Sequence, residues 1–313
     1  MMGISPLTGA VLLAAYVAAA GWRGPTALRR PWATRSPRLA MGLWLAAAVS
    51  WVLAAALAIV AVSVPHALSW SGPRSGGPAP ESFHALPGAL VAMGLLAAAL
   101  IVLRAVGCVA CELARTWHER RKHAALLTAA GKFDPSLGAV VLDQDSPAVY
   151  CLPSGRHRVV VSASALVALA PGQLHAVLAH ENAHLRARHH LILTVATALA
   201  RAFPHVPLLA LARVEVPVLA EMAADDAATR RHHPHELAAA LVILARARAR
   251  ATALTAGGTA AAARIQRLVS TDQPLRWPAR TAKLAAGAMA LMLPAAIACL
   301  PFLAVACDVS SGH

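Results

Sequence analysis

Charged residues are scarce in this chain of 313 residues, and acidic residues are the scarcest among them. Charged side chains make up 13% of the chain, with 14 Asp and Glu against 28 Lys and Arg. Globular domains average about 25% charged residues, so the composition argues against a wholly soluble protein. Hydrophobic residues reach 58%, which favours a membrane protein.

Aromatic residues are also few, at 4% of the chain, although the net charge is +14. Proteins that bind single-stranded nucleic acid interleave basic and aromatic residues, and no such pattern occurs here. We therefore expect no direct nucleic-acid partner. The arginines cluster beside apolar segments instead, which is typical of proteins that face an anionic membrane surface.

Cysteine is scarce and odd in number, with five residues, most of which lie in or beside apolar stretches. A framework of disulfides is therefore not expected. Cys108 and Cys111 form a C-x-x-C at the end of an apolar stretch. Without a second pair of ligands nearby, this motif gives little support for a redox or zinc role.

Four apolar stretches approach the 20 or so residues that a helix needs to cross a hydrocarbon core of about 30 Å. They run over 4–21, 41–64, 86–110 and 284–305. The first lacks a basic segment before it, so we interpret it as a retained helix and not as a signal peptide. The sequence thus predicts a mainly α-helical, multi-pass protein of the cell membrane. Its parts are a membrane region over 1–110, a domain over 111–283, and a fourth helix with a short outer tail over 284–313.

Loop charges predict the orientation of these helices. Between the first two stretches lie five arginines and no acidic residue, and basic residues also follow the third stretch. Positive loops stay in the cytoplasm, so the domain over 111–283 is expected there. Within it, strand-forming residues at 138–142, 148–152 and 158–162 predict a small sheet, and Pro171 marks the start of a helix. The domain is therefore expected to be α+β.

The helix predicted from Pro171 carries His180-Glu181-Asn182-Ala183-His184, an H-E-x-x-H motif. Histidines at i and i+4 share one face of a helix, so both imidazoles reach one zinc ion. Glu181 lies on a neighbouring azimuth and is the candidate general base. We expect His180 and His184 to be metal ligands, with one Zn²⁺ per chain.

A third ligand is expected from a second helix, over Glu221-Met222-Ala223-Ala224-Asp225. Glu221 is the candidate ligand, and Asp225 is expected to orient a ligand imidazole. Glu215 is an alternative ligand, and Asp226 is an alternative to Asp225. The apolar stretch between the motifs, 191–211, cannot cross a membrane once, because the ligands would then lie on opposite sides. A helical hairpin with its bend near Pro204, buried or dipping into the membrane, satisfies this constraint.

Other basic residues near the motifs have less definite roles. His157 and His189 are candidates for stabilising a transition-state oxyanion. Residues 262–268, with Arg264 and Arg267, are interpreted as a basic amphipathic segment in contact with the inner leaflet.

The motifs resemble those of the BlaR/MecR-type membrane zinc metallopeptidases, which are gluzincin-like and zincin-like in fold. The resemblance rests on Pro147–Cys151, Val159–Ser162, His180–His184 and Glu221–Asp226. It implies a cytoplasmic metallopeptidase domain between the third and fourth membrane helices. It also implies endopeptidase activity, in some relatives toward a cytoplasmic transcriptional repressor. The sensors of that family carry an extracellular penicillin-binding domain after the fourth helix, and the sequence ends at His313, so direct β-lactam sensing is not expected.

HtpX-like and CAAX prenyl proteases are similar in the same motifs, and a quality-control protease of that kind is an alternative. The single helix after the domain favours the first family. A zinc-binding scaffold without turnover is a further alternative, which would tolerate loss of Glu181. The expected partners are the lipid bilayer and a protein or peptide substrate, which we expect to lie extended along a strand at 148–152 or 158–162.

Overall fold

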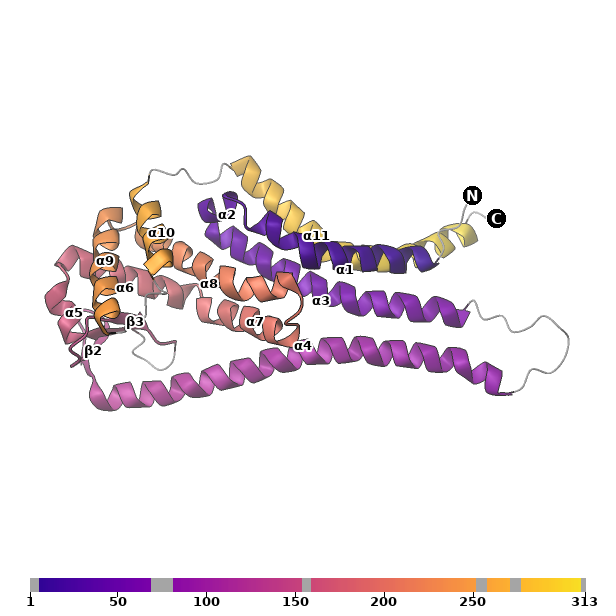
Figure 1. Cartoon of the computed structure of the whole chain (residues 1–313), viewed down its shortest axis with the longest axis horizontal. Helices are drawn as coiled ribbons and strands as arrows, with labels where there is room; N and C mark the ends of the chain where they lie inside the picture. The colour runs from indigo at the N-terminus through magenta and orange to yellow at the C-terminus, as the bar shows by residue number, and fades with distance from the viewer. Residues whose placement is uncertain (1–5, 69–80, 154–158, 252–257, 271–276, 311–313) are drawn as a thin grey trace.

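The computed structural model describes residues 6–68, 81–153, 159–251, 258–270 and 277–310. Long helices lie side by side at one end of the molecule, and a small sheet with shorter helices forms the other end (Figure 1). The long helices are α1 (Pro6–Leu28), α3 (Pro37–Leu68), α4 (Glu81–Ala130) and α11 (Trp277–Ser310).

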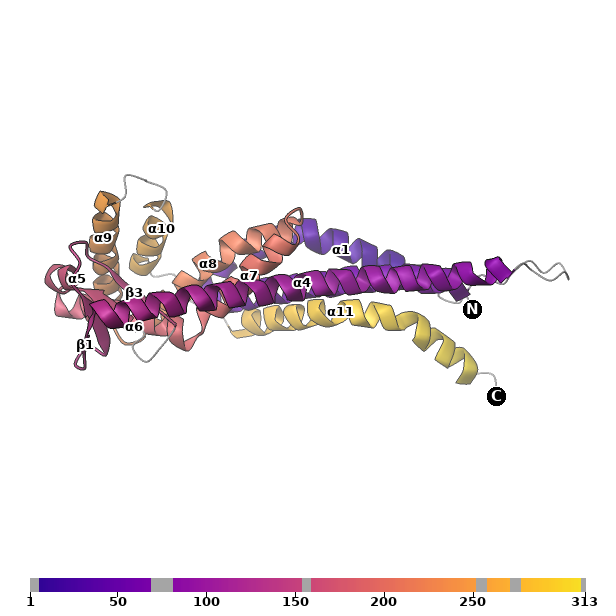
Figure 2. The ribbon, with the colours of Figure 1, turned by 90° about the horizontal axis from the view of Figure 1, so that it is seen from below.

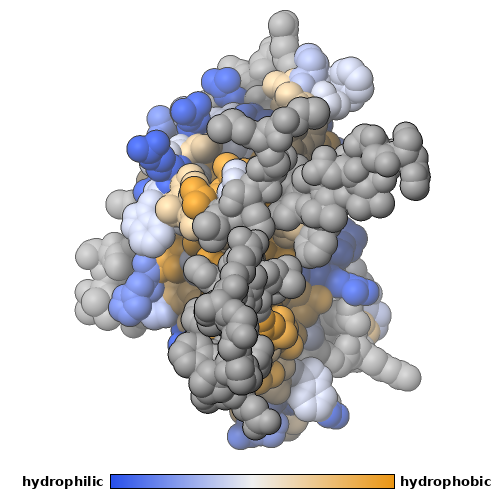
Figure 3. All heavy atoms as spheres, turned by 90° about the vertical axis from the view of Figure 1, so that its right-hand side faces the viewer, coloured by the Kyte–Doolittle hydropathy of each residue, from blue (hydrophilic) through white to orange (hydrophobic). Residues whose placement is uncertain are grey.

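Three of these helices are long and apolar enough to cross a membrane, with candidate spans at Pro37–Ser63, Gly88–Leu127 and Trp277–Cys299. Only 28%, 17% and 11% of their most apolar windows are buried within the protein, so most of their side chains face outward, as lipid-facing side chains do. Seen from the end with the termini, hydrophobic side chains lie in the middle of the view and hydrophilic ones along its outline (Figure 3). Three of the four predicted helices are thus confirmed as apolar helices of spanning length, and a crossing by α1 stays a prediction.

Polar contacts join α1, α3 and α11 inside the bundle. Ser50 Oγ donates to the carbonyl oxygen of Ala290 at 2.6 Å, and Tyr16 Oη donates to the same oxygen at 3.0 Å. The two hydroxyls are 2.6 Å apart, and Ser50 is fully buried. A carbonyl that accepts two hydroxyls fixes how α11 lies against α1 and α3, because unpaired polar groups are costly in an apolar surrounding.

Helix α4 continues well beyond the predicted apolar stretch and ends only at Ala130. Its later part is polar, and Arg115 pairs with Glu119 one turn on, at 3.1 Å. Such i,i+4 pairs support a helix that lacks a continuous apolar face. The domain boundary predicted at 110/111 therefore falls inside one continuous helix.

The sheet follows α4 and has the strand order β1-β2-β4-β3. Strand β4 is buried throughout and pairs parallel with β2 and antiparallel with β3, which leaves β3 at an edge. The three predicted strands are confirmed, while β1 was not predicted. The strands are β1 (Lys132–Asp134), β2 (Ala139–Leu142), β3 (Val149–Cys151) and β4 (Val159–Ser162).

The remaining helices connect the sheet to the bundle. Helix α6 starts at Pro171 as predicted, and the backbone N–H of Ala170 donates to Gln173 Oε1 at 3.0 Å at its start. Helices α7 and α8 form the predicted hairpin, with its bend over 203–206. These elements are α2 (Trp32–Arg35), α5 (Ala163–Ala168), α6 (Pro171–Arg186), α7 (His189–Ala202), α8 (Pro207–Ala228), α9 (Pro234–Ala251) and α10 (Gly258–Val269).

The hairpin bend packs against the membrane bundle. Phe203 meets the ring of Trp51 in α3 edge-on, with ring centroids 5.4 Å apart. Arg104 of α4 donates from Nε to the carbonyl oxygen of Ala202 at 2.7 Å, which satisfies one of the free carbonyls at the end of α7. The hairpin therefore runs beside α4, as Figure 2 also shows, and reaches the level of the candidate spans.

A buried carboxylate fastens the same hairpin to α4. Glu112, 6% exposed, accepts from Arg115 Nη2 at 2.7 Å and forms a second ion pair with Arg201 of α7. A charge in an apolar segment needs such partners, because an unpaired one carries a large desolvation cost.

Candidate metal centre

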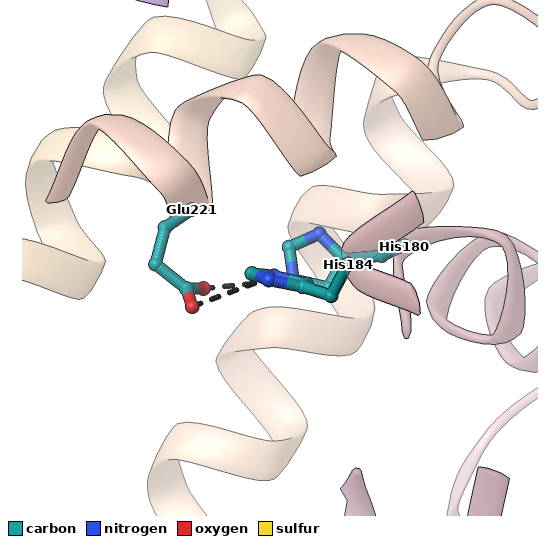
Figure 4. Close-up of side chains that lie close together, drawn as sticks. All are labelled: His180, His184 and Glu221. Atoms are coloured by element: carbon teal, nitrogen blue, oxygen red, sulfur yellow. Dashed lines mark hydrogen bonds and ion pairs between the residues drawn. The ribbon is translucent and has the colours of Figure 1, made fainter. Parts of the chain in front are cut away.

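Helix α6 places His180 and His184 on one face, toward α8. His180 is 4% exposed and lies on the buried side of α6, next to the apolar positions Leu174, Val177 and Leu178. The imidazoles are one turn apart, with ring centroids separated by 4.8 Å. Glu221, on α8, points its carboxylate at both of them (Figure 4).

The distances among these three side chains fit a tetrahedral zinc ion. His180 Nε2 and His184 Nε2 are 3.2 Å apart, and each lies 3.5 Å from an oxygen of Glu221. Ligand atoms at about 2.0–2.1 Å from a tetrahedral zinc are about 3.3–3.4 Å from one another. The two nitrogens and the carboxylate are also the donor types that zinc prefers. The predicted trio therefore lies together at a spacing that could hold the metal.

Asp225 lies behind His180, one helical turn from Glu221. Its Oδ1 is 2.9 Å from His180 Nδ1, on the side of the ring away from the trio. This distance suits a hydrogen bond, and a small rotation of the ring makes the contact linear. A carboxylate in this place holds the proton on Nδ1 and leaves Nε2 free for a metal.

Arg264 of α10 neutralises part of the acidic charge at this centre. It donates from Nε and Nη2 to the two oxygens of Asp225, at 2.8 and 2.7 Å, and its Nη1 lies 2.7 Å from Glu221 Oε2. Its side chain is only 13% exposed. The prediction that Arg264 contacts the inner leaflet is therefore wrong, because it pairs with the buried Asp225 and with Glu221 inside the domain.

His189 supports His184 from the other side. Arg188 adopts a left-handed conformation with φ of 50°, which turns the chain from α6 into α7 and brings His189 back onto His184. The two Nδ1 atoms are 3.0 Å apart. For His184 Nε2 to offer a lone pair to a metal, its Nδ1 must carry the proton and donate it to His189. His189 is 2% exposed and contacts the ligand, not a substrate, so the oxyanion role proposed for it is not supported. His157 lies outside the described residues.

Glu181 lies beside β3, and the charges of His180 and Glu221 also reach it. The thiol and the backbone N–H of Cys151 donate to its carboxylate. Burial raises the pKa of Glu181, and the positive charge of His180 and the contacts with Cys151 oppose that rise. Burial and the neighbouring Glu181 carboxylate also raise the pKa of the Cys151 thiol, to about 12, so the thiol stays protonated and continues to donate.

The imidazoles of His180 and His184 differ in their pKa values. Burial acts to lower the pKa of His180, but Asp225 and Glu221 outweigh it and raise that pKa to about 9. Burial and the charge of His180 lower the pKa of His184. The positive charge of a protonated His180 thus lies between two carboxylates, at a place where a bound cation would take over that charge.

Glu215 and Asp226, the alternatives to Glu221 and Asp225, lie outside the metal trio. Glu215 pairs with Arg29 at 2.7 Å, and Asp226 pairs with Arg267 of α10 at 2.6 Å. Neither contacts the two histidines in the part of the chain that the structure describes. Arg267 also donates to the carbonyl oxygen of Thr34, so it too packs against the protein.

Sequence reasoning missed Arg264 and the contact of Cys151 with Glu181. A signal for the first was present, since Arg264 and Leu268 lie one turn apart in an amphipathic segment. The partner of that segment, however, was not apparent. Cys151 lies in a predicted strand, but only the pairing of β3 with β4 shows which strand borders α6.

Comparison with protein-family models gives one match, to Peptidase family M48, over residues 114–273. The match covers slightly more than half of the chain and includes α6, α8 and Arg264. Searches of curated proteins and of solved structures gave no match.

Proposed function

The chain belongs to peptidase family M48, and from this premise we propose that it is a membrane-bound zinc endopeptidase. His180, His184 and Glu221 hold the metal, Glu181 is the general base, and Asp225 orients His180. The observation that carries the proposal is the spacing of the three ligand side chains, whose donor atoms are 3.2–3.5 Å apart beside the half-buried Glu181. A family of proteases makes hydrolysis of a peptide bond the expected reaction.

A bound zinc ion supplies Lewis acidity and brings the pKa of a coordinated water to about 7. Glu181 accepts the proton of the attacking water and delivers it to the leaving amine. Its raised pKa suits both steps, because a base whose pKa approaches the working pH also gives the proton back. Cys151 keeps the Glu181 carboxylate in place through its thiol and backbone N–H.

The substrate chain lies extended along β3. Of the two strands considered from the sequence, β4 is central and already paired on both sides, whereas β3 is at the edge. Among the described strands, none pairs with the outer edge of β3. Strand addition there uses backbone hydrogen bonds, so it brings a peptide past Glu181 without requiring a particular sequence.

The topology that we propose has four membrane helices, with the peptidase domain in the cytoplasm between the third and fourth. Support comes from three spans of sufficient length, from the contacts of α1 with two of them through Tyr16, and from the arginine-rich loop after α1. Reporter fusions at Gly76 and Gly138 test it, and we expect outside and inside, respectively. The same compartment for both would rule out the arrangement.

We propose that the chain is more closely related to the BlaR/MecR-type peptidases than to the HtpX-like ones. Its substrate is then a cytoplasmic regulator such as a repressor. The long apolar helix α11 that follows the domain is the arrangement that this resemblance implies. An HtpX-like quality-control role is the second candidate, because the same metal motifs serve it. Proteomics of cytoplasmic proteins that are cleaved by the wild type and not by Glu181→Gln distinguishes one defined substrate from many unfolded ones.

The central experiment measures zinc content and cleavage of a model protein by Glu181→Gln in detergent. Glutamine keeps the size of the side chain but cannot accept a proton, so we expect full zinc and a rate lowered by about 10²- to 10⁴-fold. Glu215→Gln is the matched control, since Glu215 lies on α8 outside the metal trio, and it should keep the wild-type rate. If Glu181→Gln cleaves at the wild-type rate, the protein is better described as a zinc-binding scaffold without turnover.

A further inference from the structure

Two adjacent cavities lie between the start of α3 and the turn that follows α8. Their volumes are about 410 and 500 Å³, and both are lined by Arg38 and Arg230. Arg186 lines the smaller cavity as well, and Arg35 and Arg280 line the larger one. Arginines from α2, α3, α6, α11 and the turn after α8 therefore line these two neighbouring cavities.

The positive charge of this space is not balanced. No carboxylate lines the smaller cavity, and the only one that lines the larger, Asp226, is held by Arg267. Within the described ranges, Arg35, Arg38, Arg186, Arg230 and Arg280 form no ion pair or hydrogen bond with protein. Guanidinium groups that converge without a carboxylate match the geometry of a phosphate, to which arginine binds through two parallel hydrogen bonds.

The position of the cavities indicates the source of that phosphate. The candidate spans of α3 and α11 begin at Pro37 and Trp277, beside the cavities, and Arg38 and Arg280 belong to their first turns. Trp277 is 77% exposed, and Lys283 lies over the ring of Trp32 at 4.2 Å. Exposed tryptophan and basic residues at the same end of two spans mark the level of lipid headgroups. Figure 1 shows α2, α10 and the start of α11 gathered at this end of α3.

The smaller cavity also has an apolar wall that continues into the bundle. Met41, Leu45 and Ile192 line it, and Met41 and Leu45 belong to the span of α3. A soluble anion would gain nothing from this wall, whereas the acyl chains of a lipid would cover it. Basic pockets between membrane helices bind lipid headgroups in this way.

We propose that these cavities form a binding site for the phosphate headgroup of an anionic phospholipid, with Arg38 and Arg230 as its central ligands. The acyl chains lie along Leu45 and Ile192, the partly exposed apolar residues of the wall. His189 lines the smaller cavity and contacts His184, so the lipid is separated from the metal trio by a single side chain. The proposal is independent of catalysis and needs only the full-length chain.

Binding is tested with purified full-length protein in neutral-lipid nanodiscs, titrated with phosphatidylglycerol or with phosphatidylcholine as the reference lipid. We expect preferential binding of phosphatidylglycerol, which Arg38→Ala/Arg230→Ala weakens by about fivefold per arginine. Arg38→Lys/Arg230→Lys keeps the charge but loses the paired hydrogen bonds of the guanidinium groups, so it should keep only part of the preference. Arg246→Ala is the matched control, an exposed arginine of α9 away from these cavities.

Zinc content serves as the measure of folding for each variant, because the metal trio needs α6 and α8 in place. Equal binding of both lipids by the wild type would overturn the proposal, as would an Arg246→Ala protein that loses as much preference as the double variant. A third arm uses inorganic phosphate alone. If phosphate binds as tightly as phosphatidylglycerol, with the same dependence on Arg38 and Arg230, the site belongs to a soluble phosphate and the lipid assignment is wrong.

Discussion

Two networks of charged side chains lie at different levels of the protein, and their composition is opposite. At the metal centre one arginine, Arg264, serves two carboxylates, those of Glu221 and Asp225. Between α4 and α7 two arginines, Arg115 and Arg201, serve the single buried carboxylate of Glu112. Arg115 reaches the exposed Glu119 as well.

The difference shows which network has room for a cation. At the metal centre one negative charge is left over beside two imidazoles, so a further positive charge is stabilised there. Glu112 already pairs with two arginines, so its network has no free negative charge and only fastens helices together. Similar residue types therefore give a binding site in one place and a structural clamp in the other.

The largest effect on zinc binding is expected from the loss of a metal ligand. His184→Ala takes away one of three ligands, and we expect the purified protein to lose its zinc. Glu112→Gln changes a buried carboxylate of the other network and should leave zinc content unchanged. Metal analysis of both variants checks this contrast, and full zinc in His184→Ala would mean that the metal centre lies elsewhere.

A smaller loss is expected from Asp225→Ala. The three ligands remain, but His180 loses the carboxylate that holds its proton on Nδ1, so zinc affinity should fall by about 10- to 100-fold. Competition with a chelator of known affinity measures it. Asp226→Ala is the neighbouring control, since Asp226 pairs with Arg267, and an equal loss in both variants would contradict the role of Asp225.

Arg264→Ala is expected to act mainly on stability, and more strongly without metal. It leaves Asp225, 1% exposed, without its arginine, and breaking a buried pair typically costs about 3–5 kcal/mol. Zinc supplies positive charge to the same carboxylates, so the loss of thermal stability should be smaller in the zinc-loaded protein. Melting curves of both forms provide the comparison. The same loss in both forms would show that Arg264 does not share its role with the metal.

The smallest effect is expected from Arg201→Ala. Its side chain is 52% exposed, and Arg115 remains to pair with Glu112. We expect a loss of less than about 1 kcal/mol and no change in zinc content. Melting of the detergent-solubilised protein measures it. A large loss would mean that the clamp between α4 and α7 depends on Arg201 alone.

The sequence was sufficient for features that depend on short spacings. His180 and His184 share a helical face because they are four residues apart, and Glu221 and Asp225 do so for the same reason. The hairpin over 191–211 followed from the requirement that both motifs meet. The strand at 159–162 was evident from its run of valines, because a buried strand needs no alternation.

Other features depend on contacts that no local pattern contains. Arg264 reaches Asp225 from 39 residues further along the chain, through the packing of α10 on α8. Strand β1 has three residues, two of them charged, and exists only because it pairs with β2. The extension of α4 beyond 110 was missed because hydrophobicity ends there, while helix formation continues on polar residues.

The length of α4 fixes how far the sheet lies from the apolar segment of that helix. Its 50 residues make a rod of about 75 Å, and its part after residue 110 accounts for about 30 Å of that. The sheet begins two residues after the rod ends, so β3 and Glu181 stand at a fixed distance from the end of the apolar segment. In the function that we propose, this fixed distance limits cleavage to peptide bonds that lie at the level of Glu181 along α4.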